Sequence, residues 1–302
     1  MEDLAEKGIL TLAVGKKYNN QAKYLAYSCI LHSPTLPRAI ITDDCEYFKE
    51  LYDVTIQYTA DMGDPFAVKL KLHHFSPFFK TLFLDADTLV YTDLHFMWDF
   101  FAEQSIVYQG VCKKEGNWYF KEIADVLKYY NVPWVGKLNS GIFLFRKDET
   151  GINVMNYASE LRESHGDISN PLPAQVTLPN WRGKMLSDEP FLAIAFGKYE
   201  QLPIENDFGR MGRSLIGIKN VKLDITKGIS KYIKEGKVVF PAVVHFVGGK
   251  KTYYFEERMK LLFYYIGMPG GISIFFWPIY IISRFLIFST FIKRCIKSII
   301  KR

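Results

Sequence analysis

Two aspartates one residue apart carry the clearest chemical signal in the sequence. Asp85 and Asp87 stand between two apolar runs that predict buried strand, so both carboxylates are expected at the end of a strand. Burying two neighbouring carboxylates is costly, and a divalent cation that binds both would offset that cost. Mg²⁺ and Mn²⁺ prefer oxygen ligands and are commonly shared between carboxylates and nucleotide phosphates. The pair therefore indicates a site for a metal and a diphosphate, although an isolated Asp-x-Asp is also typical of a solvated turn.

Three further groups of polar residues stand at the ends of predicted strands or at the start of a predicted helix. An Asn-Ser-Gly segment opens an apolar run, an Asp-Glu pair follows a serine that can cap a helix, and a His-x-x-Gly-x-x-Lys pattern follows a late strand. These groups are Asn139 to Gly141, Asp188 with Glu189, and His245 with Gly248 and Lys251. Each residue alone is also explained by a turn, a helix dipole or a hydrogen-bonded core histidine. Their combination with the acidic pair favours an enzyme site.

Alternating strands and helices are expected to position these groups. Apolar runs at 9–14, 39–42 and 54–58 predict strands, and the spacing at 22–30 and 45–52 predicts helices between them. This order predicts right-handed β-α-β units and a largely parallel sheet. Ligands of such sheets bind beyond the carboxyl ends of the strands, where the acidic pair also lies.

The second half of the chain continues the same pattern with longer interruptions. A proline and a following apolar stripe predict one helix over 65–75, and 119–130 also reads as helix. Residues 166–186 predict a long irregular loop of the kind that often has a function. Strands are expected at 105–109, at 141–145 and at 238–247, the last bent at a proline.

Composition and charge narrow the class of protein. With 302 residues, 49% of them apolar, the chain can bury a full core as one large domain or as one domain with an appendage. The six basic residues of 271–302, a stretch without acidic residues, account for the whole net charge of +6. Residues 1–270 therefore carry no net charge and lack the broad basic face of a nucleic-acid-binding protein, so no nucleic-acid partner is expected. The four cysteines show no metal-type spacing and are expected to be reduced, and the N-terminal residues show no secretory signal pattern.

In this order and spacing, the four groups resemble the retaining glycosyltransferases of family 8, which include bacterial lipopolysaccharide galactosyl- and glucosyltransferases and glycogenin. The resemblance covers about residues 9–255 and implies an α/β GT-A fold, a Rossmann-like, mixed and mostly parallel sheet flanked by helices. It also implies that Asp85, Asp87 and His245 hold Mn²⁺, with Mg²⁺ as the alternative, against the diphosphate of a UDP-sugar.

The same resemblance assigns the remaining site residues. It places Gly248 and Lys251 at the phosphates, Lys69 near the sugar and phosphates, and Tyr18 over the uracil. It places Asn139, Asp188 and Glu189 at the hydroxyls of the donor sugar. Two positions depart from the family pattern. The turn after the first strand offers no carboxylate to the uracil or ribose, for which Asp43 or Asp44 could compensate. Glu189 stands where glutamine or aspartate is more usual.

The C-terminal residues 266–302 form a separate segment after a catalytic domain at 1–265. Apolar residues gather on one side of a helical projection and basic residues on the other, which predicts an amphipathic helix that lies on an anionic membrane surface. A spanning helix is the rival reading, and it conflicts with the positive-inside rule. The protein is therefore expected to be cytoplasmic and peripheral, on the inner face of a membrane.

These observations predict a metal-dependent retaining glycosyltransferase that moves a hexose from a UDP-sugar to a lipid-linked or cell-envelope glycan acceptor. No carboxylate marks itself as a nucleophile, so front-face attack by the acceptor hydroxyl is the preferred mechanism. Two other classes stay open. A metal-dependent nucleotidyltransferase would release pyrophosphate, and a non-catalytic membrane-bound scaffold would show no turnover.

Overall fold

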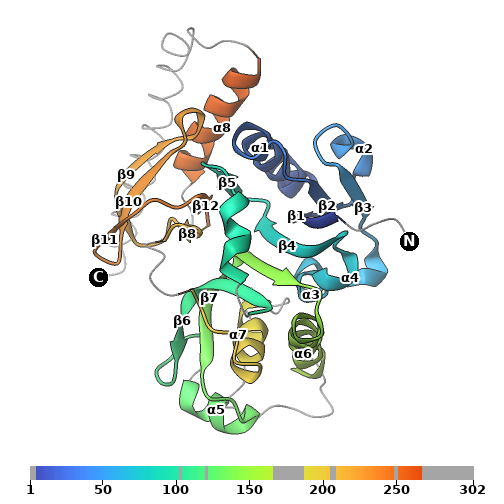
Figure 1. Ribbon diagram of the computed structural model, residues 1–302, viewed down its shortest axis with the longest axis vertical. Coiled ribbons are helices and arrows are strands. Elements are labelled where there is room, and N and C mark those ends of the chain that lie inside the picture. Colours follow the sequence, from blue (N-terminus) through green and yellow to red (C-terminus); the bar gives the residue numbers. More distant parts are fainter. Residues whose placement is uncertain are drawn as a thin grey trace, which may run out of the picture.

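The computed structural model describes residues 5–101, 104–119, 122–165, 187–204, 209–247 and 251–266. The predicted loop at 166–186, Gly248 and nearly all of the predicted membrane tail lie outside these residues. The described chain folds into strands, α-helices and short 3₁₀ helices (Figure 1). In chain order these are β1 (Ala5–Ala13), α1 (Lys16–His32), β2 (Arg38–Thr42), α2 (Cys45–Phe48), β3 (Val54–Gln57), η1 (Ala60–Met62), α3 (Pro65–Leu70), α4 (Leu72–Phe75), β4 (Phe78–Asp85), β5 (Thr88–Val90), η2 (His95–Phe101), β6 (Ile106–Lys113), α5 (Ile123–Tyr130), β7 (Val135–Arg146), α6 (Glu149–His165), α7 (Glu189–Lys198), β8 (Gly212–Ser214), β9 (Ile218–Asp224), η4 (Ile225–Lys227), β10 (Ile229–Lys234), β11 (Lys237–Val239), β12 (Val243–His245) and α8 (Lys251–Tyr265).

A six-stranded sheet forms the centre of the molecule, with the strand order β3-β2-β1-β4-β7-β6. Neighbours from β3 to β4 are parallel, whereas β7 runs antiparallel to both β4 and β6. Only β7 is therefore reversed among the strands of this sheet. The prediction of a mixed α/β fold with a mostly parallel sheet is confirmed.

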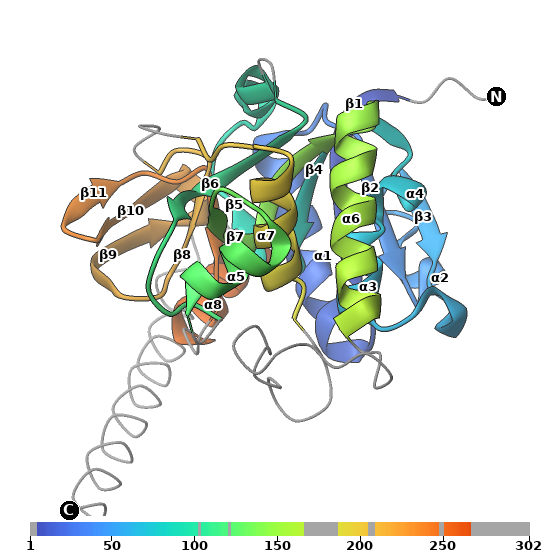
Figure 2. The same ribbon diagram turned by 90° about the horizontal axis from the view of Figure 1, so that it is seen from below.

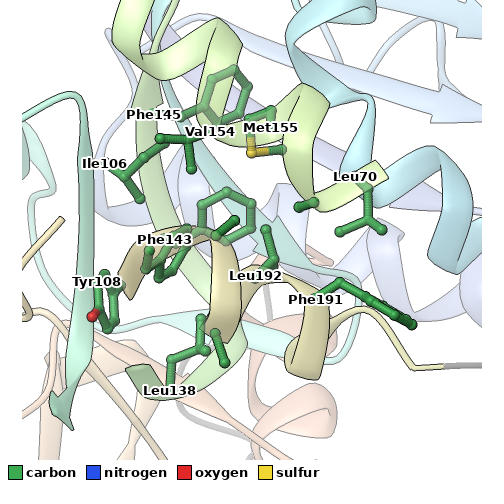
Figure 3. Close-up of a cluster of buried hydrophobic side chains, with 14 of the residues drawn as sticks. Leu70, Ile106, Tyr108, Leu138, Phe143, Phe145, Val154, Met155, Phe191 and Leu192 are labelled. Atoms are coloured by element: carbon green, nitrogen blue, oxygen red, sulfur yellow. The ribbon is translucent and has the colours of Figure 1, made fainter. Parts of the chain in front are cut away.

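Helices cover both faces of this sheet. On one face, α6 and α7 pack against β7, and Figure 3 shows apolar side chains of these three elements gathered in one cluster, including Phe143, Met155 and Leu192. On the other face, Leu25 and Cys29 of α1 pack with Leu84 of β4. Figure 2 shows α6 and α7 side by side in front of the sheet. Residues of the central strands are buried because both faces are covered.

Two small sheets complete the fold. In the first, β12 pairs antiparallel with β5 and parallel with β8. In the second, β10 lies between β9 and β11, with both pairings antiparallel. The helix α8 contacts α1 and β9, and both views place it beside the second sheet (Figures 1 and 2).

Several predicted elements differ in detail from those observed. The helix expected over 65–75 is two helices separated at Lys71, and the strand expected over 238–247 is split into β11 and β12 around Pro241. A proline has no N–H for a strand ladder, which accounts for the second break. Helix α1 begins one turn earlier than expected, after Gly15, whose φ of 89° suits glycine. Among the described residues, no helix is both long and apolar enough to cross a membrane.

Candidate metal and donor site

Strand pairing brings the acidic pair and the histidine together. Asp85 ends β4, Asp87 lies in the turn before β5, and His245 ends β12, whose pairing with β5 sets it opposite Thr88. His245 Nε2 is 2.9 Å from Asp87 Oδ1 and 3.7 Å from Asp85 Oδ2. One ligand atom from each of the three side chains lies within 4.8 Å of the others. The fold thus brings His245 to the acidic pair, although it lies 158 positions after Asp87 in the chain.

Burial and mutual charge shape the protonation of this cluster. Burial raises the pKa of Asp85 above its usual value against the opposing effects of Lys69 and His245. Burial acts to raise the pKa of Asp87, but the hydrogen bond and charge of His245, together with the charge of Lys69, outweigh burial and lower this pKa. For His245, burial is outweighed by Asp87, which raises the pKa of the imidazole. The excess of carboxylate over cationic groups favours a positive ion among these three side chains.

Asn139 fixes the orientation of the histidine ring. Its Oδ1 atom accepts a hydrogen bond of 3.0 Å from the backbone N–H of Gly141, which identifies this atom as the oxygen. The same oxygen lies 2.8 Å from His245 Nδ1, so Nδ1 must carry the proton that it donates. The Nε2 atom then faces the two aspartates. An imidazole that donates through one nitrogen and faces carboxylates with the other is the arrangement of a metal-binding histidine.

The donor set therefore fits a divalent cation. Two carboxylates supply hard oxygen ligands, and an imidazole nitrogen held in the correct tautomer adds a ligand that suits Mn²⁺ better than Mg²⁺ or Ca²⁺. Asp85, Asp87 and His245 are the residues that would hold such an ion.

Replacing Asn139 by leucine should weaken metal binding without unfolding the protein. The variant leaves all three ligands in place but removes the acceptor that holds the ring, and losing such a partner typically costs about tenfold to a hundredfold in metal affinity. Titration of Mn²⁺, followed by electron paramagnetic resonance, measures the affinity. Asn156→Leu is the matched control, because it breaks a histidine–asparagine bond of the same length between His73 and Asn156, outside this cluster. Equal Mn²⁺ affinity of the two variants would contradict the role of Asn139.

Because Gly141 has no side chain, the side chains of His245 and Asp85 can pack closely against its backbone. A Cβ atom added at this position would lie 2.4 Å from His245 Cε1 and 2.7 Å from Asp85 Oδ2. Both distances are shorter than real Cβ contacts, so any other residue would displace two of the three ligand side chains. The glycine of the Asn-Ser-Gly segment is therefore required by packing against the histidine and the aspartate.

A buried lysine joins the acidic pair to the start of α7. Lys69 Nζ is 2.9 Å from Asp85 Oδ1 and 3.3 Å from Asp188 Oδ2, and it donates a hydrogen bond to Ser140 Oγ at 3.2 Å. Burial alone would lower the pKa of Lys69, but Asp188 and Asp85 raise it far above its usual value. Lys69 is 5% and Asp188 1% exposed, so neither is a solvated surface charge. The lysine predicted from the family resemblance lies beside the metal cluster.

Glu189 is held by two donors and is not a free carboxylate. Its Oε1 accepts from the backbone N–H of Ser140 at 3.1 Å, and its Oε2 accepts from the Tyr119 hydroxyl at 2.6 Å. Burial, together with the neighbouring Asp188, raises the pKa of Glu189. Sequence reasoning missed Tyr119, because the residue lies in a turn with no motif and reaches Glu189 only through the fold. Tyr119 has a positive φ of 57°, and no pattern in the sequence predicts this backbone conformation.

The turn after β1 lies at the same edge of the sheet. Leu12 of β1 is paired with Asp85 of β4, so the turn at Gly15 follows close to the acidic pair. Asp43 accepts hydrogen bonds from the Gly15 N–H and from Asn19 Nδ2, both at 2.9 Å, and so fixes this turn. Tyr18, in the first turn of α1, is 47% exposed. Its predicted contact with a nucleobase stays a prediction, as does the compensating role of Asp43.

The predicted phosphate-binding pair is only partly described. Gly248 lies outside the described residues, and Lys251 is the first residue of α8. The backbone of α8 thus begins six residues after His245. The expected contacts of Gly248 and Lys251 with phosphates stay predictions.

Comparison with known proteins identifies the fold. No protein-family model and no curated protein matches the sequence. Among solved structures, the chain resembles the galactosyltransferase LgtC, determined with donor and acceptor sugar analogs, with a TM-score of 0.52, 14% identity and coverage of 83% of this chain and 95% of LgtC. It also resembles the WbbM bifunctional glycosyltransferase, with a TM-score of 0.54, 11% identity and coverage of 86% and 50%.

A third structure, the glycosyltransferase GlyE of Streptococcus pneumoniae TIGR4, aligns with a TM-score of 0.43, 14% identity and coverage of 66% of this chain and 44% of GlyE. The chain thus spans half or less of the length of WbbM and GlyE. At these identities, the likeness to LgtC and WbbM shows a shared GT-A type fold.

Proposed function

We propose that this protein is a metal-dependent glycosyltransferase that uses a UDP-sugar as donor. The observation that carries the proposal is the cluster of Asp85, Asp87 and His245, which fits a divalent cation at the carboxyl edge of a mostly parallel sheet. This edge is where sheets of this class bind nucleotides. The shared fold supports the proposal by analogy, since LgtC and WbbM are glycosyltransferases.

The residues around the cluster suggest how the transfer would proceed. When bound, the metal acts as a Lewis acid that neutralises charge developing on the leaving UDP. Lys69 is placed to add positive charge on the same side and to hold Asp188 in a fixed position for a donor hydroxyl. Both oxygens of Glu189 are already bonded, which favours a positioning role over nucleophilic attack. We therefore propose retention by front-face attack of the acceptor hydroxyl.

The acceptor is proposed to be a glycan carried on lipid or on the cell envelope. The amphipathic pattern of 266–302 supports attachment to the cytosolic face of a membrane, where both a UDP-sugar and a lipid-linked acceptor are accessible. A hexose is the proposed sugar, from the resemblance to galactosyl- and glucosyltransferases.

A panel of UDP-sugars, incubated with the purified protein and Mn²⁺, tests the proposed reaction. We expect slow release of UDP from one donor, and we expect EDTA to abolish it. Asp87→Asn should lower the rate by at least about a hundredfold, since the variant removes a ligand charge with little change of shape. Release of pyrophosphate from a nucleoside triphosphate would instead identify a nucleotidyltransferase. Turnover that survives both EDTA and Asp87→Asn would exclude the proposed metal site.

A further inference from the structure

The small sheet β9–β10–β11 presents a face whose charges repel one another. In β10, Ser230 and Tyr232 are buried, so Lys231 between them points away from the core. The antiparallel register sets Lys222 of β9 directly opposite Lys231. Directly opposed like charges destabilise a sheet, so this pair lowers the stability of the isolated fold.

Residues that share this side of the sheet follow from the register. Ile233 lies on the same side as Lys231 and is paired with Val238 of β11. Past a β-bulge between Lys231 and Ile233, it is also paired with Lys219 of β9. The Lys231 ammonium lies 5.4 Å from the ring centroid of Phe240, which places that ring on the same side. We call this surface the lysine face; its members are Lys219, Lys222, Lys231, Ile233, Val238 and Phe240.

The lysine face is exposed and is not neutralised by the part of the chain that the structure describes. Its three lysines are exposed, and no carboxylate among the described residues forms an ion pair with any of them. Two of its apolar members are exposed as well, Phe240 at 58% and Val238 at 45%, whereas Ile233 is half-buried. An exposed patch that combines repelling cations with a large aromatic side chain marks an interaction surface.

We propose that the lysine face docks the folded body of the protein onto an anionic lipid bilayer. Lysines can reach lipid phosphates while a phenylalanine and aliphatic side chains enter the boundary between headgroups and acyl chains. A nucleic acid offers phosphates but no apolar layer for Val238 and Ile233, so the apolar members favour the bilayer. A second copy of the same face, or the basic segment 271–302, would be repelled.

The predicted membrane tail follows an element that contacts this sheet. Helix α8 contacts β9, and its last residues Tyr264 and Tyr265, with Ile266 after them, are exposed. The apolar and basic residues that follow begin at this same end of α8. Helix α8 packs against the buried side of this sheet, so the predicted membrane tail begins on an element next to the one that carries the lysine face.

Lysine footprinting on the full chain distinguishes docking of the body from attachment by the tail alone. The protein is bound to vesicles of phosphatidylcholine with phosphatidylglycerol, and the acetylation rate of each lysine is measured by mass spectrometry. We expect Lys219, Lys222 and Lys231 to react at least about threefold more slowly than without vesicles, because contact with the surface restricts the reagent. Internal controls are exposed lysines elsewhere in the chain, namely Lys49 directly after α2, Lys128 of α5 and Lys198 of α7.

A substitution series measures the contribution of the face to binding. The triple change Lys219→Ser, Lys222→Ser and Lys231→Ser should weaken partitioning into the anionic vesicles by about tenfold to a hundredfold, less at high salt. The same triple change at the three control lysines should leave partitioning within about twofold, because those residues lie outside the docking surface. Neutral phosphatidylcholine vesicles should bind the wild type and the lysine-face variant equally.

Three results would overturn the inference. The first is unchanged acetylation of the lysine face in protein that is bound to vesicles, which would assign binding to the tail alone. The second is no binding to anionic vesicles at all. The third is protection by an RNA oligomer or an acidic protein but not by vesicles. The measurement uses no sugar donor, so its outcome is independent of the proposed transferase activity.

Discussion

Replacing Lys69 by methionine should lower the free energy of unfolding by about 3–5 kcal/mol, because it leaves buried carboxylates without a cation. Lys69 Nζ is the ion-pair partner of Asp188, which is 1% exposed, and also of Asp85. Methionine preserves most of the side-chain volume, so the loss measures charge and not packing. Urea denaturation in the presence of EDTA gives the value without a contribution from bound metal.

A second substitution separates electrostatics from other effects of Lys69→Met. Asp188→Asn removes the buried charge that the lysine neutralises, so the double variant should be more stable than Lys69→Met alone. A change of less than about 1 kcal/mol for Lys69→Met would mean that the buried ions are compensated elsewhere. Activity should be lost in both variants, since both residues belong to the proposed donor site.

Gly141→Ala should abolish metal binding and turnover while the protein stays folded. The added Cβ would overlap His245 Cε1 and Asp85 Oδ2, so at least one ligand must move by a substantial fraction of an ångström. Displacements of about 1 Å at a reacting site commonly cost about a hundredfold in rate, and loss of a ligand adds to this. Mn²⁺ titration and UDP release measure the two effects, and circular dichroism checks the fold.

Gly217→Ala is the control for this prediction. Gly217 lies before β9 at a φ of 66°, where an added Cβ meets nothing within 4 Å. This variant should lose about 1 kcal/mol of stability through backbone strain but keep its Mn²⁺ affinity. If Gly141→Ala bound Mn²⁺ as tightly as Gly217→Ala, the role of Gly141 in shaping the metal site would be wrong.

The sheet and the position of the acidic pair followed from sequence because they depend on local patterns. Buried parallel strands read as apolar runs, and the residues that end them lie at one edge whatever the details of packing. The cluster of Asp85, Asp87 and His245 was expected from the family resemblance, and the structure brings the three side chains together. Residues 218–234 were not expected as strands, because their apolar residues are interrupted by lysines that point outwards.

Other contacts between side chains that are far apart in the sequence could not be predicted. Nothing in the Asn-Ser-Gly segment indicates that Asn139 bonds the ligand histidine, and the resemblance had placed it against the sugar. Tyr119 reaches Glu189 across 70 positions, from a turn that sequence reasoning had assigned to a helix. Such contacts depend on the conformation that loops adopt in the folded protein, and the spacing of residues along the chain does not predict them.

Calorimetric titration of UDP into the protein tests the central claim, that Asp85, Asp87 and His245 hold a metal which in turn binds the donor diphosphate. We expect UDP to bind in the presence of Mn²⁺, EDTA to remove this binding, and Asp87→Asn to weaken it by at least about tenfold. The measurement requires no acceptor and no knowledge of the sugar. UDP binding of equal strength with Mn²⁺ and with EDTA, or the absence of any binding, would mean that these three residues hold no metal that binds the diphosphate.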